Sequence, residues 1–210
     1  MKPTALISLL ILAVPLAHGA FVISQPTTTG FQGNAGTGQS FTPSVGMVDD
    51  PGASTGTIEL TSFSLWSNTT GSGVAGRATT YLLIYDANPS GAANLVGASS
   101  NFIDLSTTQV AGTELQWSFS NLELDYNTLH FAVIASSNTG TSVDDIGFGF
   151  ANNTSNPYAG GTALADNFNL QGGSDLQFSA TFENPVAVPE PSAALLGGLG
   201  LLGLLRRRRA

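Results

Sequence analysis

Reactive and cross-linking side chains are scarce in this 210-residue sequence, which has no cysteine and only two histidines. The absence of cysteine excludes a disulfide framework and a thiolate metal site, so packing must stabilise the fold. His18 lies in an N-terminal segment that we expect to be removed, which leaves His130 as the remaining histidine and no lysine after Lys2. Cysteine nucleophiles, Schiff-base chemistry and multi-histidine metal sites are therefore excluded, and carboxylates remain as acid–base groups.

Basic residues are also scarce in the body of the chain. Between positions 21 and 184 the sequence has one, Arg77, against thirteen aspartates and glutamates, which gives this part a net charge of −12. A surface with this charge repels nucleic acid and anionic lipid, and it attracts divalent cations. Nucleic-acid binding is therefore excluded as a function.

The sequence also lacks the pattern of an amphipathic helix. No segment of residues 20–184 repeats apolar residues at helical spacing over eleven or more positions. Short apolar alternations broken by Gly, Asn, Asp, Ser and Thr are present instead, and they are typical of β-strands. Residues 114–121 and 175–182 alternate most clearly, and the first segment places Trp117 in the core. With about eight to ten expected strands, the sequence predicts an all-β fold: a single antiparallel β-sandwich, jelly-roll-like, over residues 20–184.

Two local patterns refine this prediction. Residues 81–85 are apolar on both strand faces, which predicts a central strand covered on both sides. Between Leu60 and Phe63 the inward phase slips by one residue, which on a continuous strand requires a β-bulge near residues 61–62. The strand is therefore expected to bend there.

The segment 129–135 predicts another strand, in which Leu129 and Phe131 point inward and His130 points outward into solvent. On this interpretation His130 is an ordinary surface side chain. Weaker alternations predict four further strands, at residues 21–24, 39–42, 95–98 and 102–105.

The N-terminus has the three parts of a secretory signal peptide. Lys2 provides the charged first region, residues 6–16 form an apolar stretch, and the small residues Ala17 and Gly19 follow. This order predicts a signal peptide over residues 1–19, with cleavage after Gly19 or, alternatively, after Ala20. The protein is therefore expected to be secreted.

The C-terminus has an equally ordered pattern. Pro189 and Pro191 favour an extended, accessible backbone around Glu190, which a processing enzyme could read. The apolar run at residues 193–205 would be roughly 20 Å long as a helix against a hydrocarbon core of about 30 Å, which is short for a permanent anchor. Four arginines then favour a cytoplasmic C-terminus, by snorkelling and by the positive-inside rule. They are Arg206, Arg207, Arg208 and Arg209.

This order of features resembles the C-terminal sorting signal of bacterial PEP-CTERM proteins, with Pro189, Glu190 and Pro191 matching the name-giving motif. The resemblance implies that a membrane-embedded exosortase, a cysteine-dependent enzyme, recognises residues 185–210 and removes the tail during export. It implies transient insertion of a hydrophobic C-terminal helix into the inner membrane of a Gram-negative-type bacterium. The exosortase and the export machinery would then be partners of this chain, which is their substrate.

Several short segments of the body resemble the choice-of-anchor β-sandwich domains that are attached to bacterial C-terminal anchors. These segments are residues 39–42, 63–65, 84–86, 129–135 and 158–161. The resemblance implies a jelly-roll-like export domain between the signal peptide and the tail.

The one cofactor that the sequence suggests is a structural calcium ion. Hard cations take carboxylate and carbonyl oxygens in loops, and Asp144 with Asp145, and Asp49 with Asp50, lie in turn-rich segments of this kind. The same pattern is typical of turns in which an aspartate bonds nearby backbone amides. Asp144 and Asp145 are the preferred candidates.

Two ligand-binding alternatives stay open. A carbohydrate-binding module for extracellular polysaccharide would use aromatic platforms, for which Tyr158, in an irregular polar loop, and Trp66, at a strand end, are candidates. A carboxylate-dependent glycosidase would need two carboxyl groups about 5 to 10 Å apart. The candidates are Glu114, Glu123, Asp125 and Asp104. Their spacing in the sequence does not favour any one pair.

The favoured prediction is an exported, non-enzymatic protein with a structural or adhesive role. Its destination would be the cell surface or the extracellular polysaccharide of a biofilm matrix. It would reach that destination after transient membrane anchoring and processing of its C-terminal tail.

Overall fold

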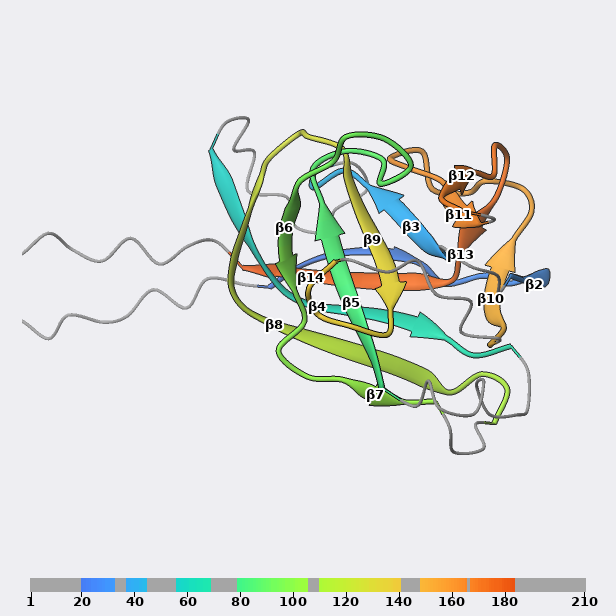
Figure 1. The fold of residues 1–210 in the computed structure, drawn as a ribbon. Helices are drawn as coiled ribbons and strands as arrows, with labels where there is room; N and C mark the ends of the chain where they lie inside the picture. Colours follow the sequence, from blue (N-terminus) through green and yellow to red (C-terminus); the bar gives the residue numbers. More distant parts are fainter. Residues whose placement is uncertain are drawn as a thin grey trace, which may run out of the picture.

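The computed structural model describes residues 20–32, 37–44, 56–68, 79–105, 110–140, 148–165 and 167–183. These residues form fourteen antiparallel β-strands and no helix (Figure 1), which confirms the all-β prediction. A helix long and apolar enough to span a membrane is accordingly not found among them. The predicted signal peptide and the predicted C-terminal helix lie outside the described residues.

The strands are two to twelve residues long. In chain order they are β1 Phe21–Gln25, β2 Gly30–Gln32, β3 Gly38–Phe41, β4 Thr57–Trp66, β5 Thr79–Tyr85, β6 Leu95–Ala98, β7 Ile103–Asp104, β8 Glu114–Asp125, β9 His130–Ala135, β10 Phe150–Asn153, β11 Ala163–Ala165, β12 Asn169–Leu170, β13 Asp175–Leu176 and β14 Phe178–Glu183.

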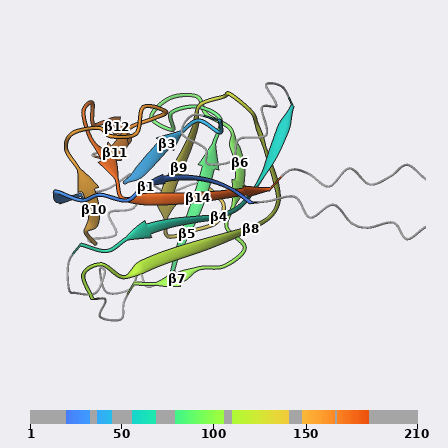
Figure 2. The same ribbon diagram turned by 180° about the vertical axis from the view of Figure 1, so that it is seen from behind.

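Two large sheets pack against each other in a sandwich-like arrangement. The first sheet has the strand order β1-β14-β4-β8, and the second has the order β12-β11-β3-β9-β5-β6, with β7 paired to the beginning of β5. A small sheet, β13-β10-β2, completes the domain. Figure 2 shows the long strands of the first sheet crossing in front of β5 and β9 of the second.

Four strand pairs are nested along the chain. β5 pairs with β6, β4 with β8, β3 with β9 and β1 with β14, so each pair encloses the previous one in sequence. Successive pairs alternate between the second and the first sheet. The path is therefore that of one antiparallel ribbon wrapped into two layers, and its outermost pair places Phe21 opposite Phe182.

The main core fills the space between the two large sheets. Its largest fully buried side chains are Trp117, Phe41, Phe63, Phe148, Phe150, Phe178 and Phe182. Trp117 of β8 is buried as predicted, and its Nε1 donates a hydrogen bond to the backbone oxygen of Thr80 in the second sheet (3.0 Å). Phe41 of the second sheet meets Phe63 of the first, with ring centroids 5.4 Å apart. These contacts join the two layers.

A smaller outer cluster covers the opposite face of the second sheet. It consists of Leu83, Tyr85, Phe131, Val133, Ala135, Leu164 and Phe168. Leu164 belongs to β11 and Phe168 to the turn between β11 and β12, so this hairpin supplies part of the cover. Because β5 contributes side chains to both the main core and the outer cluster, the prediction of a central strand that is apolar on both faces is confirmed.

The β-bulge predicted near residues 61–62 is confirmed. In the pairing of β4 with β14, Leu60 and Ser62 lie opposite consecutive residues, so Thr61 is the extra residue. The pairing of β4 with β8 shifts at the same place, where Asn121 has a φ of +53°. Both irregularities bend the sheet locally and keep the apolar residues on each side of them in the main core.

The orientation predicted for residues 129–135 is wrong. Leu129 precedes the strand and is 41% exposed, whereas His130 is 3% exposed and lies beside Phe41 in the interior. Phe131 belongs to the outer cluster rather than to the main core. Because both faces of β9 are covered by side chains, alternation of apolar residues does not reveal which face is the inner one.

The expected number of strands, about eight to ten, is too low, because the described residues form fourteen, several of them only two or three residues long. The other predicted strand positions are confirmed with one change. The weaker strands at residues 21–24, 39–42, 95–98 and 102–105 appear as β1, β3, β6 and β7. The expected strand at residues 175–182 is divided at Gln177, because β13 pairs in the small sheet and β14 in the first sheet.

Candidate functional site

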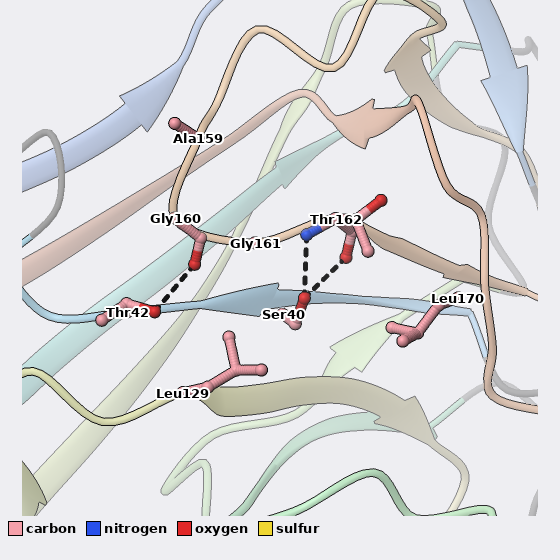
Figure 3. Close-up of a pocket in the computed structure, with 8 residues that line it drawn as sticks. All are labelled: Ser40, Thr42, Leu129, Ala159, Gly160, Gly161, Thr162 and Leu170. Atoms are coloured by element: carbon pink, nitrogen blue, oxygen red, sulfur yellow. Dashed lines mark hydrogen bonds between the residues drawn. The ribbon is translucent and has the colours of Figure 1, made fainter.

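A hollow of about 390 Å³ lies beside β3, and Figure 3 shows the residues around it. Its lining residues are Ser40, Thr42, Leu129, Ala159, Gly160, Gly161, Thr162 and Leu170. They come from β3 and its end, from the residue before β9, from the loop before β11, and from β12. The hollow therefore forms where the second sheet meets the loop at residues 159–162.

Hydrogen bonds fasten this loop to β3 (Figure 3). Ser40 Oγ donates to the backbone oxygen of Thr162 (3.0 Å) and accepts from its N–H (2.8 Å). Thr42 Oγ1 donates to the backbone oxygen of Gly160 (2.9 Å). Gly161 permits the close approach, because a Cβ at this position would overlap the carbonyl oxygen of Ser40.

A buried polar network lies next to the loop. The carboxylate of Asp175, which is fully buried, accepts hydrogen bonds from Gln39 Nε2 (2.9 Å) and from the N–H of Tyr158 (2.8 Å). The Tyr158 hydroxyl accepts from the N–H of Thr42 and donates to its carbonyl oxygen, both at 3.1 Å. Burial raises the pKa of Asp175, and it raises the pKa of Tyr158 to about 12. Neither residue lines the hollow, so the network positions the loop.

The hollow offers apolar surface and backbone. Leu129 and Leu170 point toward it in Figure 3, and they are 41% and 51% exposed. The hydroxyls of Ser40, Thr42 and Thr162 already bond to backbone groups. None of the eight lining residues is acidic, basic or phenolic, so the lining can contact a small apolar group but supplies no general acid or base.

The structure does not place Tyr158 and Trp66 as an exposed aromatic platform. Tyr158 is 5% exposed, contrary to the expectation that its polar loop would expose it, and its ring packs edge-on against Phe178 in the main core (centroids 5.2 Å apart). Trp66 is half-buried at the end of β4. Since Trp66 follows the inward-facing Leu65, it points to the other face of the first sheet. The two rings therefore do not act together.

Most of the other predicted site residues lie outside the described part of the chain. They are the sorting residues Pro189, Glu190 and Pro191, the tail residues Arg206, Arg207, Arg208 and Arg209, and the calcium candidates Asp144, Asp145, Asp49 and Asp50. Within the described ranges, no group of three or more His, Cys, Asp or Glu residues could hold a metal ion. The calcium site at those aspartates stays a prediction.

The carboxylates considered for a glycosidase do not line the hollow. Glu123 of β8 lies opposite Glu59 of β4, and Glu59 lies opposite Glu183 of β14, so three glutamates form a row across the first sheet. Like charges at such cross-strand positions repel each other. Asp104 lies on β7, which pairs with the second sheet.

No motif in the sequence predicts the hollow. The adjacent glycines at residues 160–161 were the available signal, because paired glycines indicate a turn or a close approach of backbone. That signal does not name the opposing residue, Ser40, which is more than a hundred positions away in sequence.

Comparison with known proteins identifies the tail of the chain. Residues 187–209 match the family model described as the PEP-CTERM protein-sorting motif. Neither the curated proteins nor the solved structures give a match to this chain. The motif confirms the predicted sorting signal, and it implies export, transient membrane anchoring and processing by an exosortase.

Proposed function

We propose that this protein is a non-enzymatic component of the cell surface or of the extracellular polysaccharide matrix, with a structural or adhesive role. The signal peptide starts its export, the tail holds it briefly in the inner membrane, and exosortase cleavage releases the β-domain. The observation that carries this proposal is the PEP-CTERM motif at residues 187–209.

The first and last strands of the domain pair with each other, and this arrangement supports the proposed export with a C-terminal tether. β14 ends at Glu183, four residues before the matched motif begins, and its antiparallel partner β1 begins at Phe21, two residues after the end of the expected signal peptide at Gly19. Phe21 lies opposite Phe182, so both export signals join the domain at neighbouring strand ends. The tail can therefore tether the domain without any change in the first sheet.

In this proposal the exported body is a jelly-roll sandwich of the choice-of-anchor kind. The four nested strand pairs that alternate between the two large sheets support the jelly roll, which is an antiparallel arrangement of two packed sheets built from Greek keys. The lining of the hollow supports a non-catalytic role, because its hydroxyls bond to backbone and it presents no titratable side chain.

The sorting step is tested by replacing Pro189, Glu190 and Pro191 together with alanine in the native host. Because the extended motif ahead of the apolar run would be lost, we expect the variant to keep its arginine-rich tail and to stay in the membrane fraction. Intact-mass spectrometry reports whether the tail is present. Pro185→Ala, a proline change outside the matched residues, is the control and should be processed normally. Normal processing of the triple variant would show that the motif does not direct sorting.

A further inference from the structure

Two aromatic side chains meet on the outer face of the second sheet. Tyr81 of β5 and Phe102, which precedes β7, have ring centroids 6.2 Å apart and an angle of 60° between the rings. Phe102 is 56% exposed, and Tyr81 is half-buried at the margin of the outer cluster. An exposed phenylalanine supported by a second ring presents apolar surface that gains stability when a ligand covers it.

Two polar side chains share this face. Thr79 of β5 lies opposite Asp104 of β7. Because successive residues of a strand point to opposite faces, Thr79 and Asp104 lie on the same side as Tyr81 and Phe102. Thr80, between Thr79 and Tyr81, is fully buried on the other side. We call Thr79, Tyr81, Phe102 and Asp104 the aromatic platform.

Hydrogen bonds from the interior hold the aromatic platform in place. Thr80 Oγ1 donates to the backbone oxygen of Ile103 (2.8 Å), and the backbone oxygen of Thr80 accepts from Trp117 Nε1 (3.0 Å). Asn101, directly before Phe102, makes two hydrogen bonds to the backbone of β8 (3.1 and 2.7 Å). A surface fixed in this way loses little conformational entropy when a ligand binds.

We infer that the aromatic platform binds the uncharged pyranose rings of a polysaccharide. The C–H face of a pyranose stacks on an aromatic ring, and its hydroxyls can bond to the Asp104 carboxylate and to the hydroxyls of Thr79 and Tyr81. This combination of one exposed ring with carboxylate and hydroxyl groups around it fits a sugar better than a wholly apolar partner.

The negative charge of the protein disfavours other ligands for the aromatic platform. Residues 21–184 carry a net charge of −12, which disfavours anionic polymers, anionic lipid surfaces and a second copy of the same chain. A neutral polymer has no such repulsion to overcome. This inference goes beyond the sorting function, whose test reads retention of the tail and does not depend on sugar binding.

The test is affinity electrophoresis of the full-length protein, in mild non-ionic detergent, through gels that contain dextran, laminarin, galactomannan or hydroxyethylcellulose. We expect at least one of these neutral polymers to retard the protein, and dextran sulfate to leave its mobility unchanged. Phe102→Ala should weaken the apparent affinity about tenfold or more, as loss of a central aromatic contact does. Tyr81→Phe, which keeps the ring, should weaken it less than Tyr81→Ala.

Two control variants locate the binding surface. Val110→Ala removes an apolar side chain that is 67% exposed elsewhere, and Leu170→Ala changes the hollow; both should bind like the unmodified protein. The inference is overturned if none of the four polymers retards the protein, or if Phe102→Ala binds as well as the unmodified chain. A dimer seen by sedimentation that Phe102→Ala dissociates would also overturn it, since the platform would then be a self-association surface.

Discussion

The two faces of the second sheet are buried in different ways. On the inner face, the main core packs against another sheet, and its rings come mainly from strands whose register is fixed by long ladders of backbone hydrogen bonds. On the outer face, part of the outer cluster comes from the β11–β12 hairpin, whose strands have only three and two residues. Backbone pairing alone therefore gives the outer cover much less support.

The outer cluster compensates with local backbone geometry and a side-chain anchor. Asn167 and Phe168 both have positive φ, +65° and +66°, which costs a residue other than glycine roughly 1–2 kcal/mol. This conformation nevertheless places Phe168 in the outer cluster, where it is buried. Asn88 Nδ2 donates to the backbone oxygen of Phe168 (3.1 Å) and holds the turn. Among the described residues, a short hairpin with a strained turn therefore contributes to burial on the outer face, whereas a whole sheet does so on the inner face.

The largest expected effect is on the main core. Trp117→Ala removes a fully buried indole and its hydrogen bond to Thr80, so it should lower the free energy of unfolding by about 3–5 kcal/mol. Urea denaturation of the full-length protein, followed by circular dichroism, measures the change. Trp117→Phe keeps most of the ring and should cost less. A loss below about 1 kcal/mol for the alanine variant would contradict the dominance of the main core.

A smaller effect is expected in the outer cluster. Phe168→Ala loses the buried ring but keeps the unfavourable φ, so we expect a loss of about 3 kcal/mol in the free energy of unfolding, at the lower end of the range for such a change. Phe168→Gly loses the same ring and relieves the strain, because glycine adopts positive φ readily. The two variants should therefore be about equally stable, or the glycine variant more so, in the same denaturation assay. A glycine variant clearly less stable than the alanine variant would show that strain at this turn is unimportant.

The smallest expected effect is on the pH dependence of stability, which should depend on a residue of the interior, His130, and not on the outer cluster. Burial lowers the pKa of His130 below its ordinary value of 6.5, although the Asp125 carbonyl and the carboxylates of Asp125 and Asp86 act in the opposite direction. The unfolded chain then takes up its proton first as the pH falls below 6.5, so stability present at neutral pH is lost as the pH falls through the folded pKa. His130→Gln should reduce this loss, measured as the change in Tm between pH 7.5 and 5.5.

The control for this experiment is the outer cluster. Its titratable member, Tyr85, has a pKa raised by burial from 10.0 and stays neutral in this range, so Phe168→Ala should keep the pH dependence of the unmodified protein. Burial raises the pKa of Asp175, so the stability that this residue contributes declines as the pH rises above 3.8. Because Asp175 is present in every variant compared, its contribution cancels. Equal pH slopes for His130→Gln and the unmodified chain would contradict the assignment to His130.

The features predicted correctly depend on neighbours in sequence. Trp117 sits in a strand that alternates cleanly, and the bulge at Thr61 follows from a phase slip within one strand, so local pattern was enough for both. The orientation of His130 was wrong because residues far along the chain, Leu164 and Phe168, cover the other face of its strand. The sequence around position 130 does not indicate that these distant residues pack on the strand.

The candidate sites were less predictable for the same reason. Tyr158 lies in a polar, glycine-rich loop, which predicts exposure, but Gly161 lets the loop approach Ser40 closely enough to bury the ring. The aromatic platform depends on the register between β5 and β7, which no motif specifies. The sorting signal needed no tertiary contact, because an exosortase reads it as a linear sequence, and it was found from the residues alone.

The pairing of the first strand with the last has a consequence for the timing of export. β1 is the first described strand to leave the translocation channel, but its partner β14 is among the last parts of the body to follow. The first sheet therefore stays incomplete until residue 183 has crossed, and pairings this distant in sequence form slowly. For a chain that crosses the membrane unfolded, we therefore expect the sorting tail to arrive before β1 and β14 have paired. A tail that anchors the chain briefly would then give the last strand time to find the first.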